Sequence, residues 1–127
     1  MATVSPRGDP HVVPVSIGWL DERIYLNAGV DDVKVRNIEA NRAVCLHLEA
    51  REETGWDSLL IWGSGRVLRS RADRERLWRG VLSYDLDDFD PEGPATETSC
   101  FVEVVRKRPL CSCGTGWTAR RDGGDEL

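Results

Sequence analysis

A glycine turn followed by two cations is the stretch of this sequence with the most chemical potential. Residues 24–49 are predicted to form a strand, a turn at Gly29, a short helix and a second strand. Lys34 and Arg36 fall near the start of that helix, where the first N–H groups have no partner and the helix dipole favours an anion. Both cations can add charge-assisted hydrogen bonds. The pattern therefore indicates an anion site, such as one for a phosphate group.

The faces of this helix leave an alternative open. Val35 and Ile38 are predicted to pack on the core, whereas Lys34, Arg36 and Asn37 project elsewhere. Cations on the outer face of an amphipathic helix are commonly there only to be solvated. Taken alone, the spacing does not separate a phosphate site from a solvated face.

Two predicted strands position the helix. Residues 24–28 are β-branched and aromatic, which suits a half-buried pleated surface, and Gly29 permits a tight exit. Asp31 or Asp32 is predicted to cap the helix by accepting bonds from its first N–H groups. Residues 43–49 alternate in polarity, so one face of the second strand should hold three apolar side chains, Val44, Leu46 and Leu48.

The rest of the chain is predicted to form further strands and one more helix. Strands are expected at 1–4, 11–19, 58–67, 99–106 and 110–121, turns at 5–10 and 20–23, charged loops at 50–57 and 85–98, and a helix at 71–84. In the 11–19 strand, Val13, Val15 and Ile17 share one face. Gly63 and Gly65 share a face of the 58–67 strand, where another backbone or a flat ligand can approach, or where the strand bulges.

Length and charge narrow the class of protein. The 127 residues are expected to form one domain over residues 1–121, followed by a frayed tail at 122–127. The net charge of −5 argues against a nucleic-acid binder driven by phosphate contacts. No apolar run reaches the ~20 residues of a membrane helix, and the N-terminus lacks the layout of a signal peptide. The chain is therefore expected in the cytoplasm, without membrane or nucleic-acid partners and with reduced cysteines.

The side chains do not form a recognisable catalytic motif of their own. There is no nucleophile elbow, P-loop or GxGxxG turn, and His11 and His47 fall within strand patterns that favour structural roles. Cys111 and Cys113 form only a Cys-x-Cys, so no metal site is predicted. Any chemistry is expected to come from a bound cofactor.

The order of elements resembles a known family. The run Thr3-Val-Ser-Pro-Arg-Gly-Asp-Pro-His-Val-Val-Pro-Val15 is followed by a strand, a glycine turn, Lys34-Val-Arg36-Asn37 and a hydrophobic strand. This resembles the flavin-binding split-barrel family, the pyridoxamine 5′-phosphate oxidase-like group, with its deazaflavin (F420)-using branch. The similarity extends over residues 2–49, is looser over 58–67 and is weak over Gly114-Thr-Gly-Trp-Thr-Ala-Arg120.

The resemblance implies a mainly β fold, a six- to seven-stranded antiparallel FMN-binding split barrel with two flanking helices, assembled as a homodimer. It further implies an oxidoreductase that uses FMN or F420 on a small organic substrate, with no pyridoxal-phosphate pocket identifiable. The residues implied in cofactor binding are Pro14, Val15, Ser16, Asn27, Ala28, Gly29, Lys34, Arg36, Asn37, Trp62, Trp117 and Arg120.

The chain also departs from the family pattern. Asp32 stands where members often carry Ser, Thr or Arg, two positions before the lysine, and Asn41-Arg42 replaces the usual Asn-Pro or Asp-Pro. In the family a helix and the first half of the first strand normally precede this point, so we expect either a truncated gene model or a shortened variant. A carboxylate at Asp32 competes with a phosphate for the same N–H groups. The alternative is therefore a split barrel without cofactor binding, which acts as a dimeric structural or interaction module.

Overall fold

A computed structural model describes residues 1–48, 52, 58–107, 111–113 and 119–121. The strands are β1 (Ala2–Val4), β2 (Pro10–Val12), β3 (Gly18–Leu20), β4 (Arg23–Gly29), β5 (Ala43–Leu48), β6 (Ser58–Leu68), β7 (Ser99–Arg106), β8 (Cys111–Cys113) and β9 (Ala119–Arg121). The helices are α1 (Val33–Ala40) and α2 (Arg71–Leu77), with short 3-10 turns η2 (Leu86–Asp88) and η3 (Gly93–Ala95).

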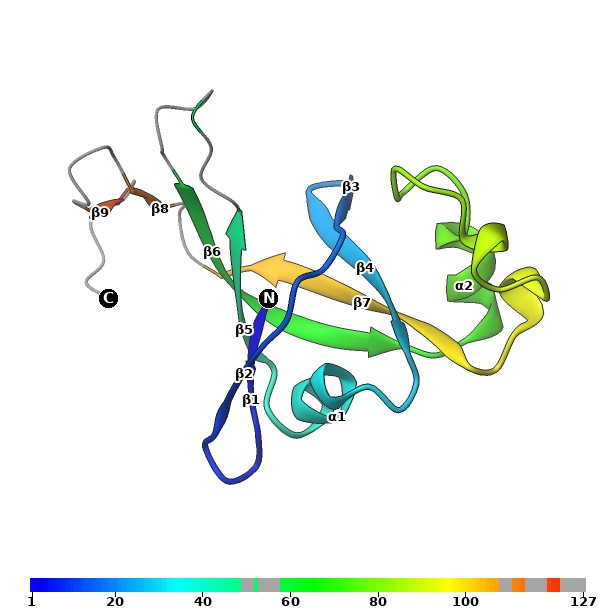
Figure 1. Ribbon diagram of the computed structural model, residues 1–127, viewed down its shortest axis with the longest axis horizontal. Helices are drawn as coiled ribbons and strands as arrows, with labels where there is room; N and C mark the ends of the chain where they lie inside the picture. Colours follow the sequence, from blue (N-terminus) through cyan, green and yellow to red (C-terminus); the bar gives the residue numbers. More distant parts are fainter. Residues whose placement is uncertain (49–51, 53–57, 108–110, 114–118, 122–127) are drawn as a thin grey trace.

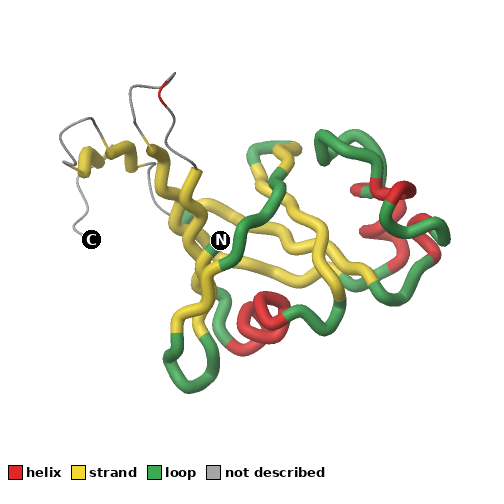
Figure 2. The backbone as a smooth tube through the Cα atoms, in the orientation of Figure 1, coloured by secondary structure: helices red, strands yellow, loops and turns green. Residues whose placement is uncertain are grey.

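One antiparallel sheet organises the described residues (Figures 1 and 2). Seven strands follow the order β2-β1-β5-β6-β7-β4-β3, and β8 and β9 extend it from the start of β6. The centre of the sheet is formed by β4, β7, β6 and β5, which pair along most of their lengths. The predicted mainly β architecture with two helices is confirmed.

The two faces of the sheet bury different clusters. The inner cluster gathers the side chains of alternate residues on β4, β5, β6 and β7 under α1; its fully buried members include Ile24, Leu26, Val35, Ile38, Ile61, Val102 and Val104. The outer cluster lies under α2 and η2 and holds Tyr25, Leu68, Leu77, Trp78, Leu82, Leu86 and Phe101. Because successive side chains of a strand point to opposite faces of the sheet, the residues of β4 contribute alternately to the inner and the outer cluster.

Local hydrogen bonds and backbone angles account for the two hairpin turns. Residues 5–9 close the β1–β2 hairpin, where Ser5 Oγ accepts hydrogen bonds from the N–H groups of Arg7 and Asp9. Asp21 and Glu22 join β3 to β4 with φ values of 50° and 62°. Two consecutive left-handed residues match the twist of a two-residue hairpin, so the predicted tight turn is confirmed.

The predicted strand over 11–19 is wrong. Its first part is β2 and its last part is β3, while residues 13–17 form neither helix nor strand. Pro14 has no N–H to donate to a ladder, which favours a break at this point. Val15 and Ile17 still pack against the inner cluster. Residues 13–17 are therefore an irregular segment that packs on the inner cluster through Val15 and Ile17.

The helices also differ from the sequence prediction. α2 ends at Leu77 instead of residue 84, because Gly80 at φ 83° turns the chain away, and Tyr84 is exposed. Ser70 caps α2 by accepting a bond from the Asp73 N–H over 3.1 Å. Asn37 of α1 is buried, contrary to its predicted outward position, and donates to Thr3 Oγ1 over 3.0 Å. The single last strand predicted at 110–121 is replaced by the antiparallel pair β8 and β9.

Candidate functional site

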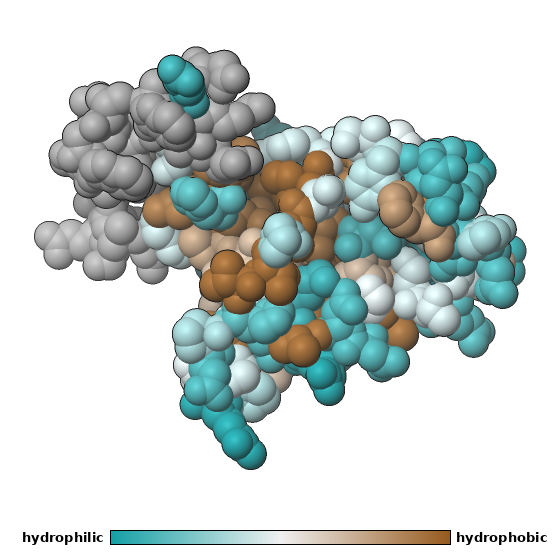
Figure 3. Space-filling model, in the orientation of Figure 1, coloured by the Kyte–Doolittle hydropathy of each residue, from teal (hydrophilic) through white to brown (hydrophobic). Residues whose placement is uncertain are grey.

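A cavity of about 300 Å³ opens beside the N-terminal strand. Its seven lining residues, six of them of apolar type, come from three segments: Met1; Pro14, Val15 and Ile17; and Leu46, His47 and Leu48. Hydrophobic residues gather on this face around the N-terminal strand (Figure 3). Pockets for small organic ligands are typically apolar and begin near this volume. The cavity therefore suits a flat, largely apolar group.

Two of the predicted residues, Pro14 and Val15, line this cavity, whereas Ser16 is exposed and is not part of the lining. His47 and its neighbours on β5 were not predicted. His47 is an exposed residue at the rim, although its strand pattern had favoured a structural role. The alternation of β5 identified its apolar face, but only the pairing of Ala2 with Cys45 places that face beside Met1.

The start of α1 holds the predicted cation in an ion pair. Lys34 Nζ donates to Asp32 Oδ2 over 2.6 Å, and the same oxygen accepts the Gly29 N–H over 3.1 Å. The Lys34 side chain is 16% exposed and that of Asp32 is 41% exposed. The hydrogen bond from Lys34, helped by that from Gly29, lowers the pKa of the Asp32 carboxyl below its usual 3.8. Asp32 is thus held as a carboxylate at the helix start.

Asp32 is the N-cap residue of α1, but it does not cap the helix through its side chain. The prediction that Asp31 or Asp32 accepts bonds from the first N–H groups of the helix is therefore wrong for Asp32, the residue at the cap position. Its carboxylate turns back to the turn at Gly29 and forward to Lys34 instead. A lysine ammonium is a stronger donor than a backbone N–H, because it carries a full charge.

Three of the remaining predicted cofactor residues near α1 have structural partners, and Arg36 does not have a described one. Asn27 donates to Ser99 Oγ over 2.7 Å and to the Cys100 carbonyl over 3.1 Å. Ala28 is buried in the inner cluster. Asn37 is committed to Thr3, and Arg36 is exposed. The structure thus brings Gly29 and Lys34 together around Asp32.

The predicted contacts from later in the chain are only partly described. Trp62 is half-buried on the outer face of β6, and its carbonyl accepts the Lys107 N–H over 2.9 Å. Trp117 lies outside the described residues, and Arg120 falls in β9, where only the backbone is described. Their roles stay predictions.

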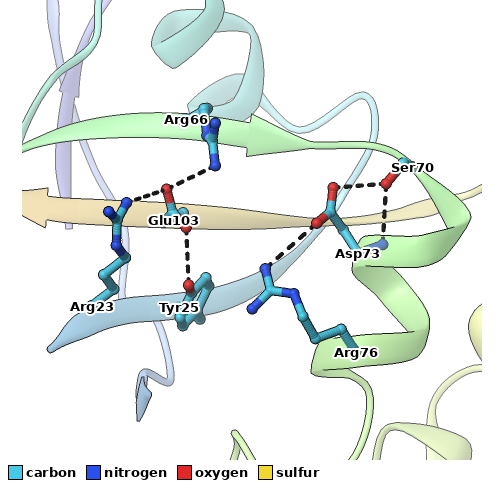
Figure 4. Close-up of polar contacts among 7 residues, drawn as sticks. All are labelled: Arg23, Tyr25, Arg66, Ser70, Asp73, Arg76 and Glu103. Atoms are coloured by element: carbon cyan, nitrogen blue, oxygen red, sulfur yellow. Dashed lines mark hydrogen bonds and ion pairs between the residues drawn. The ribbon is translucent and has the colours of Figure 1, made fainter. Parts of the chain in front are cut away.

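A second polar cluster lies on the outer face of the sheet, and no sequence pattern singled it out (Figure 4). Glu103 of β7 is buried; its Oε1 accepts Arg23 at 3.0 Å and Arg66 at 3.1 Å, and its Oε2 accepts the Tyr25 hydroxyl at 2.9 Å. The feature of the sequence that could have revealed this cluster is Glu103, a single acid within the otherwise apolar run of residues 100–105.

Metal-binding clusters and membrane-spanning helices are both absent from the described residues. Within the ranges that the structure covers, no group of three or more His, Cys, Asp or Glu side chains is arranged to hold a metal ion. The side chains of Cys111 and Cys113 are outside the description. No helix in the described part of the chain is long and apolar enough to cross a membrane.

The antiparallel sheet and the two helices have the architecture of a split barrel. The chain belongs to the family described as Pyridoxamine 5'-phosphate oxidase, whose family model matches residues 1–104. No curated protein matches the chain.

Solved structures share this fold at low sequence identity. A protein of Clostridium acetobutylicum related to general stress protein 26 superposes with a TM-score of 0.73 at 15% identity, over 94% of this chain and 82% of that one. An F420 reductase gives a TM-score of 0.60 at 23% identity, over 86% and 84% of the two chains. A pyridoxamine 5'-phosphate oxidase-related, FMN-binding protein of Nostoc punctiforme gives 0.65 at 11%, over 97% and 86%. These likenesses confirm the split-barrel fold.

Proposed function

We propose that this chain binds a flavin or deazaflavin, FMN or F420, and acts as an oxidoreductase on a small organic substrate. The observation that carries the proposal is the apolar cavity lined by Pro14 and Val15 in a member of this family. The names of two solved relatives, an FMN-binding protein and an F420 reductase, support the choice of cofactors. The proposed setting is a cytoplasmic homodimer.

The chain's own residues have defined roles in this proposal. Ile17, Leu46 and Leu48 would keep water from the ring, and Pro14 and Val15 would lie against it. The cofactor, when bound, supplies the two-electron transfer, and the protein supplies position and electrostatics.

The residues of the candidate site suit the cofactor ring better than they suit a phosphate group. Most of the residues that line the cavity have apolar side chains, which suits a tricyclic ring, whereas Lys34 and the Gly29 N–H already bond to Asp32. A phosphate at the start of α1 must displace that carboxylate or lie beside it. The ring end of the site is therefore the part that supports the proposal.

Purification and titration test the proposal. A yellow protein with a flavin absorption spectrum supports FMN, and a colourless protein that takes up F420 but not FMN supports the deazaflavin. Binding should weaken when the cavity is filled by Val15→Trp, while Val12→Trp, at a residue that is 74% exposed and outside the cavity, should leave binding unchanged. A folded wild type that binds neither cofactor contradicts the proposal.

The Asp32–Lys34 ion pair favours a second candidate, a split barrel that has lost its cofactor and serves as a dimeric structural or interaction module. In that case the pair is simply a local stabiliser of the turn before α1. Stoichiometric binding of either cofactor rules this candidate out.

A further inference from the structure

The outer cluster covers only part of the outer face of the sheet. It holds Leu68 and Phe101, which pair at the end of β6 and the start of β7, under α2 (Figure 1). Leu60 and Trp62 of β6 and Val105 of β7 lie further along the same face and are not members of that cluster. Leu60 and Trp62 are half-buried, and Val105 is 39% exposed. This part of the face therefore presents apolar side chains to solvent.

Two arginines border the exposed part of the face (Figure 4). Arg23 and Arg66 each bond through one nitrogen to Glu103 Oε1, at 3.0 Å and 3.1 Å. A guanidinium has five N–H donors, and these two side chains are 47% and 58% exposed, so each keeps donors for a further acceptor. Val105 lies opposite Ser64, two residues before Arg66 on β6. We call the following four residues the basic patch: Arg23, Trp62, Arg66 and Val105.

A loop of opposite character follows the η2 turn. Phe89 is 75% exposed and Tyr84 is 36% exposed, and their rings meet edge to face with centroids 5.5 Å apart. Asp88 and Asp90 flank Phe89, and Asp88 is exposed. Leu86 of η2 belongs to the outer cluster, so this loop is anchored on the same face of the sheet as the basic patch. We call the following four residues the acidic-aromatic loop: Tyr84, Asp88, Phe89 and Asp90.

The basic patch and the acidic-aromatic loop are complementary in charge and in polarity. The patch offers guanidinium donors beside apolar side chains, and the loop offers carboxylates beside aromatic rings. Exposed apolar groups of this kind commonly mark association surfaces. Since every copy of the chain carries both surfaces on one face, a twofold rotation that brings two such faces together can form the same contact twice.

We propose that the acidic-aromatic loop of one copy docks on the basic patch of a second copy, and that this contact occurs twice in a symmetric dimer. The Phe89 ring packs on Trp62 and Val105, and the Asp88 carboxylate accepts from the Arg66 guanidinium. The inference rests on the homodimer of the proposed function and adds which surfaces meet.

Loss of the aromatic ring tests the apolar half of the contact. The dissociation constant of the dimer, measured by sedimentation equilibrium, should rise by about tenfold or more in Phe89→Ser, because a buried aromatic side chain is lost from each of two contacts. Trp19→Ser is the control: Trp19 is 51% exposed, and its partner across β3 and β4 is Ile24 of the inner cluster. It should leave the dissociation constant within about twofold of wild type.

A double-mutant cycle tests the charged half of the contact. Asp88→Lys should raise the dissociation constant by about tenfold or more, since it places a cation against Arg66. Arg66→Gln removes that cation and keeps an amide donor for Glu103. In the Arg66→Gln background, Asp88→Lys should therefore weaken the dimer at least about threefold less than it does in the wild type. Asp31→Lys makes the same change in net charge at an exposed residue before α1 and should have little effect.

The outcomes separate this inference from the cofactor proposal. A wild type that is monomeric at micromolar concentration overturns the inference, as do equal effects of Phe89→Ser and Trp19→Ser or a strictly additive cycle. Titration of the same proteins with FMN and F420 tests the cofactor separately. A monomer that binds either cofactor leaves the cofactor proposal standing, and a dimer that shows the expected coupling but binds neither cofactor contradicts only the cofactor proposal.

Discussion

The Tyr25 hydroxyl donates to Glu103 Oε2 over 2.9 Å and links β4 to β7 on the outer face of the sheet. Both side chains are buried, and the other oxygen of Glu103 accepts the half-exposed Arg23 and Arg66. A buried carboxylate is tolerated when its oxygens are bonded in this way. The cluster therefore fixes the positions of three strands, β4, β6 and β7, relative to one another (Figure 4).

Removal of this carboxylate should destabilise the fold. Glu103→Ala leaves the Tyr25 hydroxyl buried without its acceptor, at a cost of about 1–3 kcal/mol. The lost contacts of Glu103 with Arg23 and Arg66 add less to this cost, because both arginine side chains reach solvent. The free energy of unfolding is measured by urea denaturation. Glu39→Ala is the control, because Glu39 pairs with Arg69 on the surface and should cost less than about 1 kcal/mol. Equal losses in the two variants would contradict the structural role of the buried cluster.

The elements of the fold were predictable where local pattern decides them. The alternation of residues 43–49 correctly indicated the apolar face of β5, and the spacing of Val35 and Ile38 indicated the buried face of α1. Predictions based on local pattern alone failed where a distant segment intervenes. Asn37 is polar and was predicted to project away, but β1 presents Thr3 as a buried partner for its amide.

The prediction of the candidate functional site from the sequence was limited in the same way. The sequence singled out the free N–H groups at the start of α1, with Lys34 and Arg36, as donors and recognised Asp32 as a competitor, since these residues are close along the chain. It did not find the cavity residues Met1 and Leu46, because they meet only through the pairing of β1 with β5. Which distant strands pair depends on the whole sheet, whereas the local pattern of a strand indicates only which of its faces is buried.

The glycines of β6 differ in what they permit. A Cβ at Gly63 would lie 2.8 Å from the Val105 carbonyl oxygen and 2.7 Å from Val104 Cγ1, whereas one at Gly65 would meet only side chains at 3.0 Å or beyond. Gly63 thus allows the backbone of β7 to approach β6 closely. The sequence analysis had named the approach of another backbone as one interpretation of these glycines, beside a flat ligand or a bulge. Gly63→Ala should lower stability by about 1–3 kcal/mol, as overpacking does, and by more than Gly65→Ala. The midpoints of urea denaturation compare the stabilities of the two variants. A larger loss of stability for Gly65→Ala than for Gly63→Ala would contradict this packing.

Acid should weaken the turn before α1 through Asp32. The hydrogen bond from Lys34 lowers the pKa of this carboxyl in the folded state below 3.8, so the unfolded chain takes up the proton first as pH falls. The contribution of Asp32 to stability is therefore complete above the unfolded pKa and is lost as pH falls through the folded pKa. The melting-temperature difference between wild type and Asp32→Asn should be constant above about pH 5 and shrink below about pH 4.

Asp31→Asn supplies the control for this titration, since the exposed Asp31 has no described hydrogen bond to lose. Its melting-temperature difference from wild type should vary less across the same pH range. A difference for Asp32→Asn that grows on acidification would contradict the ion pair with Lys34.

The outer face of β6 and β7 is the surface on which we expect two copies to associate. Leu60 and Trp62 are half-buried there, and Val105, paired with Ser64, is 39% exposed on the same side. Exposed apolar patches on a sheet commonly mark association surfaces, and closed dimers are the commonest assembly. Sedimentation at micromolar concentration should give a mass near twice the 14.2 kDa of the chain.

A charge on that face should disrupt the dimer. Val105→Glu brings a carboxylate into the proposed interface, where burial without a partner costs several kcal/mol, and should shift the mass toward the monomer. Val33→Glu is the matched control, since Val33 on α1 is 42% exposed and lies away from this face. A monomeric wild type would remove both the dimer and any cofactor contact from a second copy. Dissociation by Val33→Glu but not by Val105→Glu would move the interface to the α1 side of the molecule.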